Sequence, residues 1–298
     1  MSKSKAILFD VKRFAVHDGS GIRTTLFFKG CPLRCIWCQN PEGISSKIEP
    51  LWIEKQCIHC HLCENTDPHV HFSNRPILEK GANLEQLVRI CPANALRLDS
   101  KEYDMDSLVS TAMQDEAFFK HGGGVTFSGG EPLMQADSLI ELARRLKARG
   151  VSCAIESSFF APLEVVKNVV KYLDQIYVDL KIFDRMSHQK YTGVSNERII
   201  KNIEYILTSE HKEKVIVRTP LIPGCTATCE NISSIASFIS SLNPEVRYEL
   251  LNYNPLASSK YVLLNQSYAL QEEKAFSKEK LLWFQNIAKK HGIKNLIE

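Results

Sequence analysis

Short apolar runs rich in β-branched residues recur along the chain and predict buried parallel strands. Six such runs lie at residues 24–28, 124–127, 151–155, 175–180, 214–218 and 247–251. The last five are followed by stretches with apolar residues at helical spacing, at 135–149, 163–173, 196–209, 230–242 and 273–291. This alternation predicts βα units with right-handed crossovers on one parallel sheet. Periodicity alone does not separate a barrel from a flat, doubly wound sheet.

One segment, from about residue 49 to 100, breaks the strand–helix alternation. It contains several histidines and four cysteines and shows little regular rhythm. We therefore expect an α/β domain in two parts, residues 1–48 and 101–298, with a small inserted domain at 49–100.

Composition excludes some classes of protein and leaves others open. Apolar residues make up 44% of the 298 residues and charged residues 24%, which is ordinary for a globular protein. A net charge of +3, without basic blocks, gives no reason to expect a nucleic acid as partner. We find neither a signal-peptide core nor an apolar segment long enough for a membrane, so we expect a cytoplasmic protein without a membrane partner.

Cys31, Cys35 and Cys38 supply three thiolates within eight residues, directly after the first predicted strand. Structural zinc sites use four closed ligands, and common iron–sulfur clusters also use four thiolates. Three cysteines would leave one iron without a protein ligand, and an open coordination position is where metal chemistry takes place. The alternative is three incidental cysteines, which the residues around them disfavour.

The C-x3-C-x2-C spacing resembles that of the radical S-adenosylmethionine (SAM) enzymes. The resemblance implies a SAM-binding four-iron, four-sulfur (4Fe-4S) cluster, whose free iron is chelated by the amino and carboxylate groups of SAM. It also implies the radical SAM fold, a partial (β/α)6 TIM-like barrel, in preference to a flat sheet or a closed eightfold barrel.

Four further cysteines lie in the inserted segment. Cys57, Cys60 and Cys63 have the spacing C-x2-C-x2-C, and Cys91-Pro92 follows 28 positions after Cys63. In two-cluster ferredoxins the fourth cysteine of each run binds the other cluster, so this set resembles a bacterial ferredoxin reduced to one cluster. We predict a ferredoxin-like insert with a second 4Fe-4S cluster; a four-cysteine zinc site is the alternative. The neighbouring histidines are not assigned as ligands.

Polar residues also cluster where the predicted strands end, as at the mouth of a barrel active site. These strand-end positions are Ser128-Gly129-Gly130-Glu131, Glu156-Ser157, Asp179-Leu180-Lys181, Arg218 and Tyr253-Asn254. The chain has no P-loop, no G-x-G-x-x-G fingerprint and no G-x-S-x-G elbow, so phosphate-cradling and esterase chemistry are disfavoured.

Residues 17–23 (His-Asp-Gly-Ser-Gly-Ile-Arg) and 37–42 (Trp-Cys-Gln-Asn-Pro-Glu) narrow the resemblance to the glycyl-radical-enzyme activating enzymes, such as pyruvate formate-lyase activase. The resemblance implies that the Gly129-Gly130-Glu131 segment binds the SAM amino group. The other implied SAM contacts are Asn40, Ser157, Asp179, Lys181, Arg218 and, where the family usually has histidine, Asn254. Asp18 and Arg23 would help to receive the partner's glycine-bearing loop, although Ser20 replaces the usual proline between them.

The implied activity is reductive cleavage of SAM to a 5′-deoxyadenosyl radical, which takes the Hα of one glycine in a partner glycyl-radical enzyme. Flavodoxin or ferredoxin would supply the electron. Two alternatives stay open at this point: a radical SAM enzyme with another substrate, and a ferredoxin-like electron carrier without catalysis.

Overall fold

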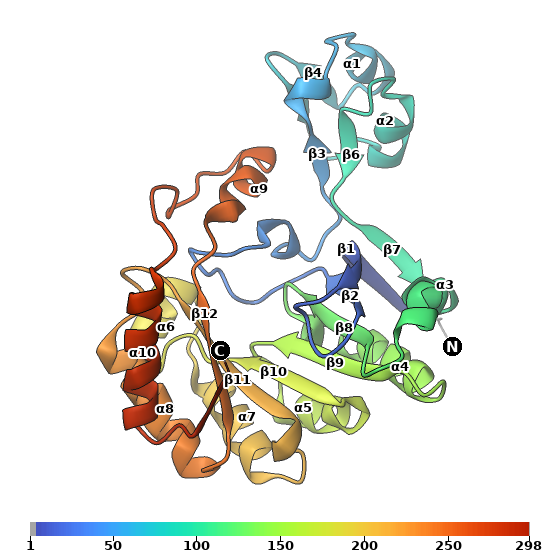
Figure 1. Cartoon of the computed structure of the whole chain (residues 1–298). Coiled ribbons are helices and arrows are strands. Elements are labelled where there is room, and N and C mark those ends of the chain that lie inside the picture. Colours follow the sequence, from blue (N-terminus) through green and yellow to red (C-terminus); the bar gives the residue numbers. More distant parts are fainter. Residues whose placement is uncertain (1–3, 298) are drawn as a thin grey trace.

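The structure, a computed structural model, describes residues 4–297 and is built around one nine-stranded sheet (Figure 1). Seven neighbouring strands, from β2 to β13, run parallel, while β1 is antiparallel to both β2 and β7. In sheet order the strands are β13 (Asn295–Ile297), β12 (Arg247–Asn252), β11 (Val215–Leu221), β10 (Gln175–Asp179), β9 (Ser152–Ser157), β8 (Gly124–Gly129), β2 (Arg23–Phe28), β1 (Lys5–Ala15) and β7 (Lys101–Asp104). In this described part of the chain β13 and β7 are opposite edges of the sheet, so the barrel is open.

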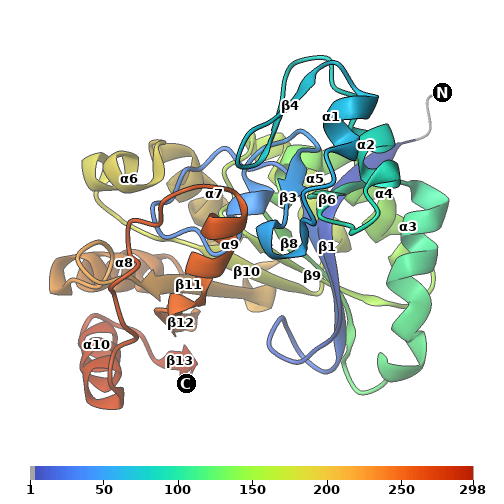
Figure 2. The same cartoon turned by 90° about the horizontal axis from the view of Figure 1, so that it is seen from above.

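Helices cover the outer face of the sheet and form the main core with it (Figures 1 and 2). The α-helices outside the insert are α3 (Met105–Ala112), α4 (Ala136–Lys147), α5 (Leu163–Val169), α6 (Arg185–Thr192), α7 (Glu197–Thr208), α8 (Cys229–Leu242), α9 (Ser258–Leu263) and α10 (Lys278–Lys290). Alternate strand residues such as Val125, Ile155 and Val217 are fully buried against these helices. The opposite set of side chains therefore faces the inside of the barrel.

All six predicted strands are present, and the predicted partial barrel is confirmed. The five predicted helices are also present with shifted ends. The last one begins at Lys278 rather than at residue 273, because the Ser277 side chain accepts a hydrogen bond from the Lys280 amide and caps the helix there. The helix predicted over 163–173 ends at Val169 and continues as a 3-10 turn, Val170–Tyr172.

Residues 50–98 form their own small elements beside the barrel (Figures 1 and 2). They comprise β3 (Pro50–Trp52) paired with β6 (Leu96–Leu98), β4 (Val70–Phe72) paired with β5 (Pro76–Leu78), and the helices α1 (Leu62–Thr66) and α2 (Leu84–Ile90). Val70, Leu87 and Leu96 make a hydrophobic cluster separate from the main core. The domain boundaries and the ferredoxin-like character of this segment stay predictions.

No helix within residues 4–297 is long and apolar enough to cross a membrane.

Candidate functional site

The loop with Cys31, Cys35 and Cys38 follows the carboxyl end of β2. Its start is fixed by two backbone bonds, from the Gly30 amide to the Gly43 carbonyl (2.8 Å) and from the Cys31 amide to the Ile44 carbonyl (3.0 Å). Its middle is held by α6, whose Thr192 carbonyl accepts the Arg34 amide at 2.7 Å, while the Cys38 amide bonds to the Cys35 carbonyl at 3.0 Å. All three cysteines are partly buried and unbridged. The loop is thus a fixed platform that presents three thiols.

The surroundings of these thiols disfavour free thiolates. Burial raises the pKa of the Cys31 thiol to about 12, and the nearby Glu131 carboxylate adds to the effect. Burial likewise raises the pKa of Cys35 to about 12, although the Lys181 ammonium opposes the shift. A bound metal cluster would stabilise the thiolate forms of these side chains. The donor set therefore fits an iron–sulfur cluster.

Gly129 and Gly130 lie against the cysteine loop rather than in open space. The backbone of Gly129 has φ +126°, and a Cβ there would overlap the backbone of Phe28. A Cβ on Gly130 would overlap the carbonyl oxygens of Gly30 and Gly43. Both glycines are needed because the end of β8 packs directly on the backbone of the cysteine loop.

The Glu131 carboxylate is buried and is held by four donors. Its Oε1 accepts from the Ser157 hydroxyl (2.6 Å) and the Leu133 amide (3.2 Å). Its Oε2 accepts from the amide (2.9 Å) and the hydroxyl (2.6 Å) of Ser158. Burial raises the pKa of Glu131, and these donors oppose the shift. Because both oxygens are engaged by two donors each, a SAM ammonium could reach this carboxylate only by displacing one of them.

Four charged side chains from three neighbouring strand ends form a continuous network on the inner face of the barrel. Arg218 donates from Nη1 to Glu156 Oε1 (2.6 Å) and from Nε to Asp179 Oδ1 (3.0 Å). Lys181 Nζ donates to Asp179 Oδ2 at 2.9 Å, and Ser128 Oγ donates to Glu156 Oε2 at 2.7 Å. The predicted site residues Asp179, Lys181 and Arg218 are therefore brought together.

The network favours the charged forms of Asp179, Lys181 and Arg218. Burial works against ionisation of Asp179, but Lys181 and Arg218 outweigh it and hold the pKa of that carboxyl below its usual value. Burial also disfavours the charged Lys181, yet the Asp179 carboxylate outweighs it and raises the pKa of Lys181. Asp179, Lys181 and Arg218 are therefore held in their charged forms inside the barrel.

Asn40 and Asn254 flank the cysteine loop at its outer side. Lys260, on α9, donates from Nζ to Asn40 Oδ1 and to Glu42 Oε1, both at 2.6 Å. The Asn254 carbonyl accepts from Gln39 Nε2 at 3.1 Å, while its side-chain oxygen caps the next turn. The segment around α9 therefore packs against the end of the cysteine loop.

Arg23 lies at the other end of the barrel strands, with no exposed surface. Its guanidinium donates to Thr126 Oγ1 (2.6 Å) and to the carbonyls of Val125 (2.8 Å) and Ser152 (3.1 Å), and burial lowers its pKa. Arg23 also donates to the Ser20 carbonyl and so stabilises the loop before β2. Its part in receiving the partner's glycine-bearing loop stays a prediction. Asp18 lies in the loop before β2, where its carboxylate accepts from Thr25 Oγ1 at 2.7 Å.

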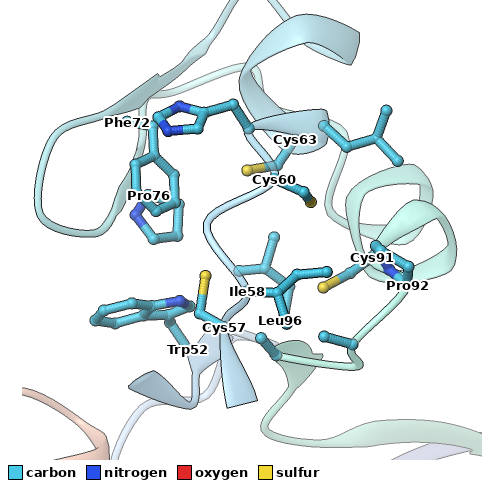
Figure 3. Close-up of a pocket in the computed structure, with 14 residues that line it drawn as sticks. Trp52, Cys57, Ile58, Cys60, Cys63, Phe72, Pro76, Cys91, Pro92 and Leu96 are labelled. Carbon is cyan, nitrogen blue, oxygen red and sulfur yellow. The ribbon is translucent and has the colours of Figure 1, made fainter. Parts of the chain in front are cut away.

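The four insert cysteines surround one pocket (Figure 3). Cys57 and Cys60 lie in the loop before α1, Cys63 lies on α1, and Cys91 follows α2. The rest of the lining is mainly apolar: Trp52, Ile58, Leu62, Phe72, Pro76, Pro92, Ala93, Ala95 and Leu96, with His61 as the polar exception. Within residues 4–297 no three or more Cys, His, Asp or Glu side chains converge closely enough to hold a single metal ion.

Some residues at the site had no assigned role in the sequence. Glu156 was placed at a strand end, and only its bond to Arg218 marks it as part of the network. Lys260 and Tyr261 on α9 lie more than 200 positions from their partners at the cysteine loop, Asn40 and the Cys38 carbonyl. Local spacing carries no signal for such pairs.

Comparisons with known proteins agree with this fold and site. Residues 25–232 match the radical SAM superfamily. The 4-hydroxyphenylacetate decarboxylase activating enzyme of Clostridioides difficile is 34% identical over 300 residues, covering 97% of this chain and 95% of the relative. The (2S)-3-sulfopropanediol dehydratase activating enzyme of Klebsiella oxytoca is 36% identical over 281 residues, covering 90% and 88%. A radical SAM methyltransferase from Sphaerobacter thermophilus superposes with a TM-score of 0.54 over 92% of this chain and 65% of that chain, at 13% identity, which shows a shared fold alone.

The chain therefore belongs to the radical SAM superfamily, which uses a 4Fe-4S cluster and SAM. Within it, the chain is one of the activating enzymes that generate a 5′-deoxyadenosyl radical from SAM and make a glycyl radical on a partner enzyme. The predicted family and activity are confirmed.

Proposed function

We propose that Cys31, Cys35 and Cys38 hold the SAM-binding cluster and that the charged network inside the barrel binds SAM beside it. The observation that supports this assignment is the position of Lys181, which ends the network and lies close enough to Cys35 to oppose the rise of its pKa. Lys181 and Arg218 suit the carboxylate of SAM, and the oxygens of Asp179 and Glu156 suit its ammonium and ribose hydroxyls. Asn40 and Asn254 would bound the ligand at the outer side of the loop.

A cluster held by Cys31, Cys35 and Cys38 would supply the electron for cleavage of a sulfur–carbon bond of SAM, which is the chemistry that the partner's glycyl radical requires. The chain itself binds, orients and shields these groups. The ends of β8 and β9 are held against the cysteine loop by Gly129, Gly130, Glu131 and Ser157. These residues contribute to SAM binding because they place Glu156 and the backbone around it.

We further propose that Cys57, Cys60, Cys63 and Cys91 hold a second 4Fe-4S cluster. Four thiolates on one zinc converge within about 4 Å of one another, because each zinc–sulfur bond is about 2.3 Å. In a four-iron cluster each thiolate binds its own iron, which requires a wider arrangement. The observation that supports the proposal is that all four cysteines line one mainly apolar pocket.

The partner is a glycyl-radical enzyme, and Asp18 is proposed to contact its glycine-bearing loop. The electron donor is proposed to be flavodoxin or ferredoxin, with the insert as its docking site. We also place the protein in the cytoplasm, because clustered unbridged cysteines suit a reducing compartment.

Lys181→Met tests the SAM site. Loss of a charged hydrogen bond of about 1.5–3 kcal/mol should weaken SAM binding about 10- to 100-fold. Lys294→Met is the matched control, because Lys294 also pairs with a carboxylate, Glu245 at 2.8 Å, but on the exposed surface. Binding would be measured anaerobically on reconstituted protein by equilibrium dialysis, with dithionite-driven release of 5′-deoxyadenosine alongside. Equal SAM affinity in both variants would contradict the assignment of Lys181.

A further inference from the structure

The insert joins the barrel through a narrow neck formed by Glu49 and Asp99. The Asp99 amide donates to the Glu49 carbonyl at 2.9 Å, and the Glu49 amide donates back to Asp99 Oδ1, also at 2.9 Å. The neck is continued by the pairing of Pro50 with Leu98 at the start of the small sheet. Both crossings of the chain therefore meet at one carboxylate.

Lys29 binds this carboxylate from the barrel side. It is buried, and its ammonium pairs with Asp99 Oδ2 while also donating to the Glu42 carbonyl at 2.7 Å. Lys29 stands two residues before Cys31, and Glu42 follows Cys38 by four. The Lys29 ammonium thus connects the two ends of the cysteine loop with Asp99. Through Asp99 it also connects them with both chain segments of the neck.

Apolar packing does not fix the insert relative to the barrel. The hydrophobic cluster of the insert is separate from the main core, so it does not fix how residues 50–98 are oriented. A buried ion pair adds little to net stability, because desolvation offsets its attraction, but its fixed geometry can specify one arrangement of the groups around it. Asp99 meets the geometric requirement, since Lys29, the Glu49 amide and the Ser100 hydroxyl (2.6 Å) all donate to it.

We propose that Lys29 and Asp99 are a positioning pair that fixes the insert relative to the loop of Cys31, Cys35 and Cys38. The role in catalysis rests on the proposed function of the insert as the place where a protein donor docks. With the orientation lost, reduction by flavodoxin, a one-electron donor that must dock, slows. Reduction by dithionite, which is small and needs no docking, does not.

Asp99→Asn tests the pair, because the amide keeps an oxygen for the Glu49 amide and removes the charge that holds Lys29. Lys5→Met is the control, as Lys5 pairs with Glu102 across β1 and β7 close by but on the exposed surface. Hydrogen exchange of the full chain is expected to rise about tenfold or more at the Glu49 and Asp99 amides in Asp99→Asn. Amides between β10 and β11 should not change, and Lys5→Met should behave as the wild type. If Asp99→Asn folds poorly, the double variant Lys29→Met/Asp99→Asn replaces it. This variant also removes the unpaired, buried Lys29 ammonium, and the same exchange measurement then tests the pair.

The second readout is the ratio of flavodoxin-driven to dithionite-driven SAM cleavage, which a loss of general stability would not move. We expect this ratio to fall about tenfold in Asp99→Asn and to stay constant in Lys5→Met. Unchanged exchange at the neck, or an unchanged ratio, would overturn the proposal. An iron content of about four rather than about eight per chain would instead refute the second cluster. In that case hydrogen exchange at the Glu49 and Asp99 amides would still test the positioning role of Lys29 and Asp99.

Discussion

Glu131→Gln separates two roles for the Gly-Gly-Glu segment, direct binding of SAM and internal bracing. A carboxylate offers acceptors on both oxygens, and here Oε1 faces the Leu133 amide and Oε2 faces the Ser158 amide. Glutamine has one oxygen and one NH2 group. Whichever way it is turned, its NH2 group meets a backbone N–H that then has no acceptor.

The magnitude follows from these contacts. An unsatisfied buried N–H costs about 1–3 kcal/mol, and a hydrogen bond to a charged group contributes about 1.5–3 kcal/mol. We therefore expect Glu131→Gln to lower the free energy of unfolding by about 2–4 kcal/mol. Ser158→Ala, which removes one hydroxyl donor of the same carboxylate, should cost about 1 kcal/mol.

Urea unfolding of the metal-free chain measures this effect without any contribution from SAM. Glu164→Gln is the matched control: Glu164 pairs with Lys167 on the exposed surface of α5, so the change should stay within about 0.5 kcal/mol. If Glu131→Gln unfolds like the wild type but binds SAM at least tenfold more weakly, the bracing role is refuted and Glu131 is a SAM ligand.

Two further predictions concern the buried Asp115 and the insert. Arg13 lowers the pKa of Asp115 despite its burial, and Thr24 adds a hydrogen bond. The carboxylate therefore stabilises the fold above about pH 4, and this contribution is lost as the pH falls through the depressed pKa. Asp115→Asn should lower the free energy of unfolding by about 1–3 kcal/mol at pH 7, with a smaller difference from the wild type below about pH 4 in a pH series of urea titrations; a difference independent of pH would contradict the reasoning. Cys57→Ser should reduce iron from about eight to about four per chain, with dithionite-driven SAM cleavage retained. Eight irons in that variant, measured by colorimetric iron assay, would exclude Cys57 as a ligand.

Much of the barrel follows from local pattern. The six central strands are continuous apolar runs because helices or the barrel interior cover both faces of the sheet. The edge strand β7 (Lys101–Asp104) has no buried residue, and beyond Leu8 polar and apolar residues are mixed in β1 and only Ala15 is buried, so neither strand carries a comparable signal. The cysteine loop is predictable for the same local reason: its three cysteines fall within eight residues.

Pairings between distant residues could not be predicted in this way. Lys29 with Asp99, Lys260 with Asn40, and Glu131 with Ser158 are each set by how separate elements pack. Arg23 is a further case: it lies in a motif beside Asp18, but its guanidinium donates to carbonyls at the starts of β8 and β9, and the motif does not predict these contacts. Residues that are neighbours in a sequence motif can therefore have side chains with different contacts and different roles in the fold.

The contacts of residues 129–131 explain why this short segment and the cysteine loop belong together. The Gly130 amide bonds to the Phe28 carbonyl at 2.9 Å, and the Glu131 amide bonds to the Gly30 carbonyl at 2.8 Å, so the backbone of the segment fixes the start of the loop. The Glu131 carboxylate at the same time fixes the end of β9 through Ser157 and Ser158. Glu156 precedes these serines and binds Arg218, which in turn binds Asp179. One tripeptide therefore sets the distance between the three thiols and the charged network, and a change that loosens it should disturb both at once.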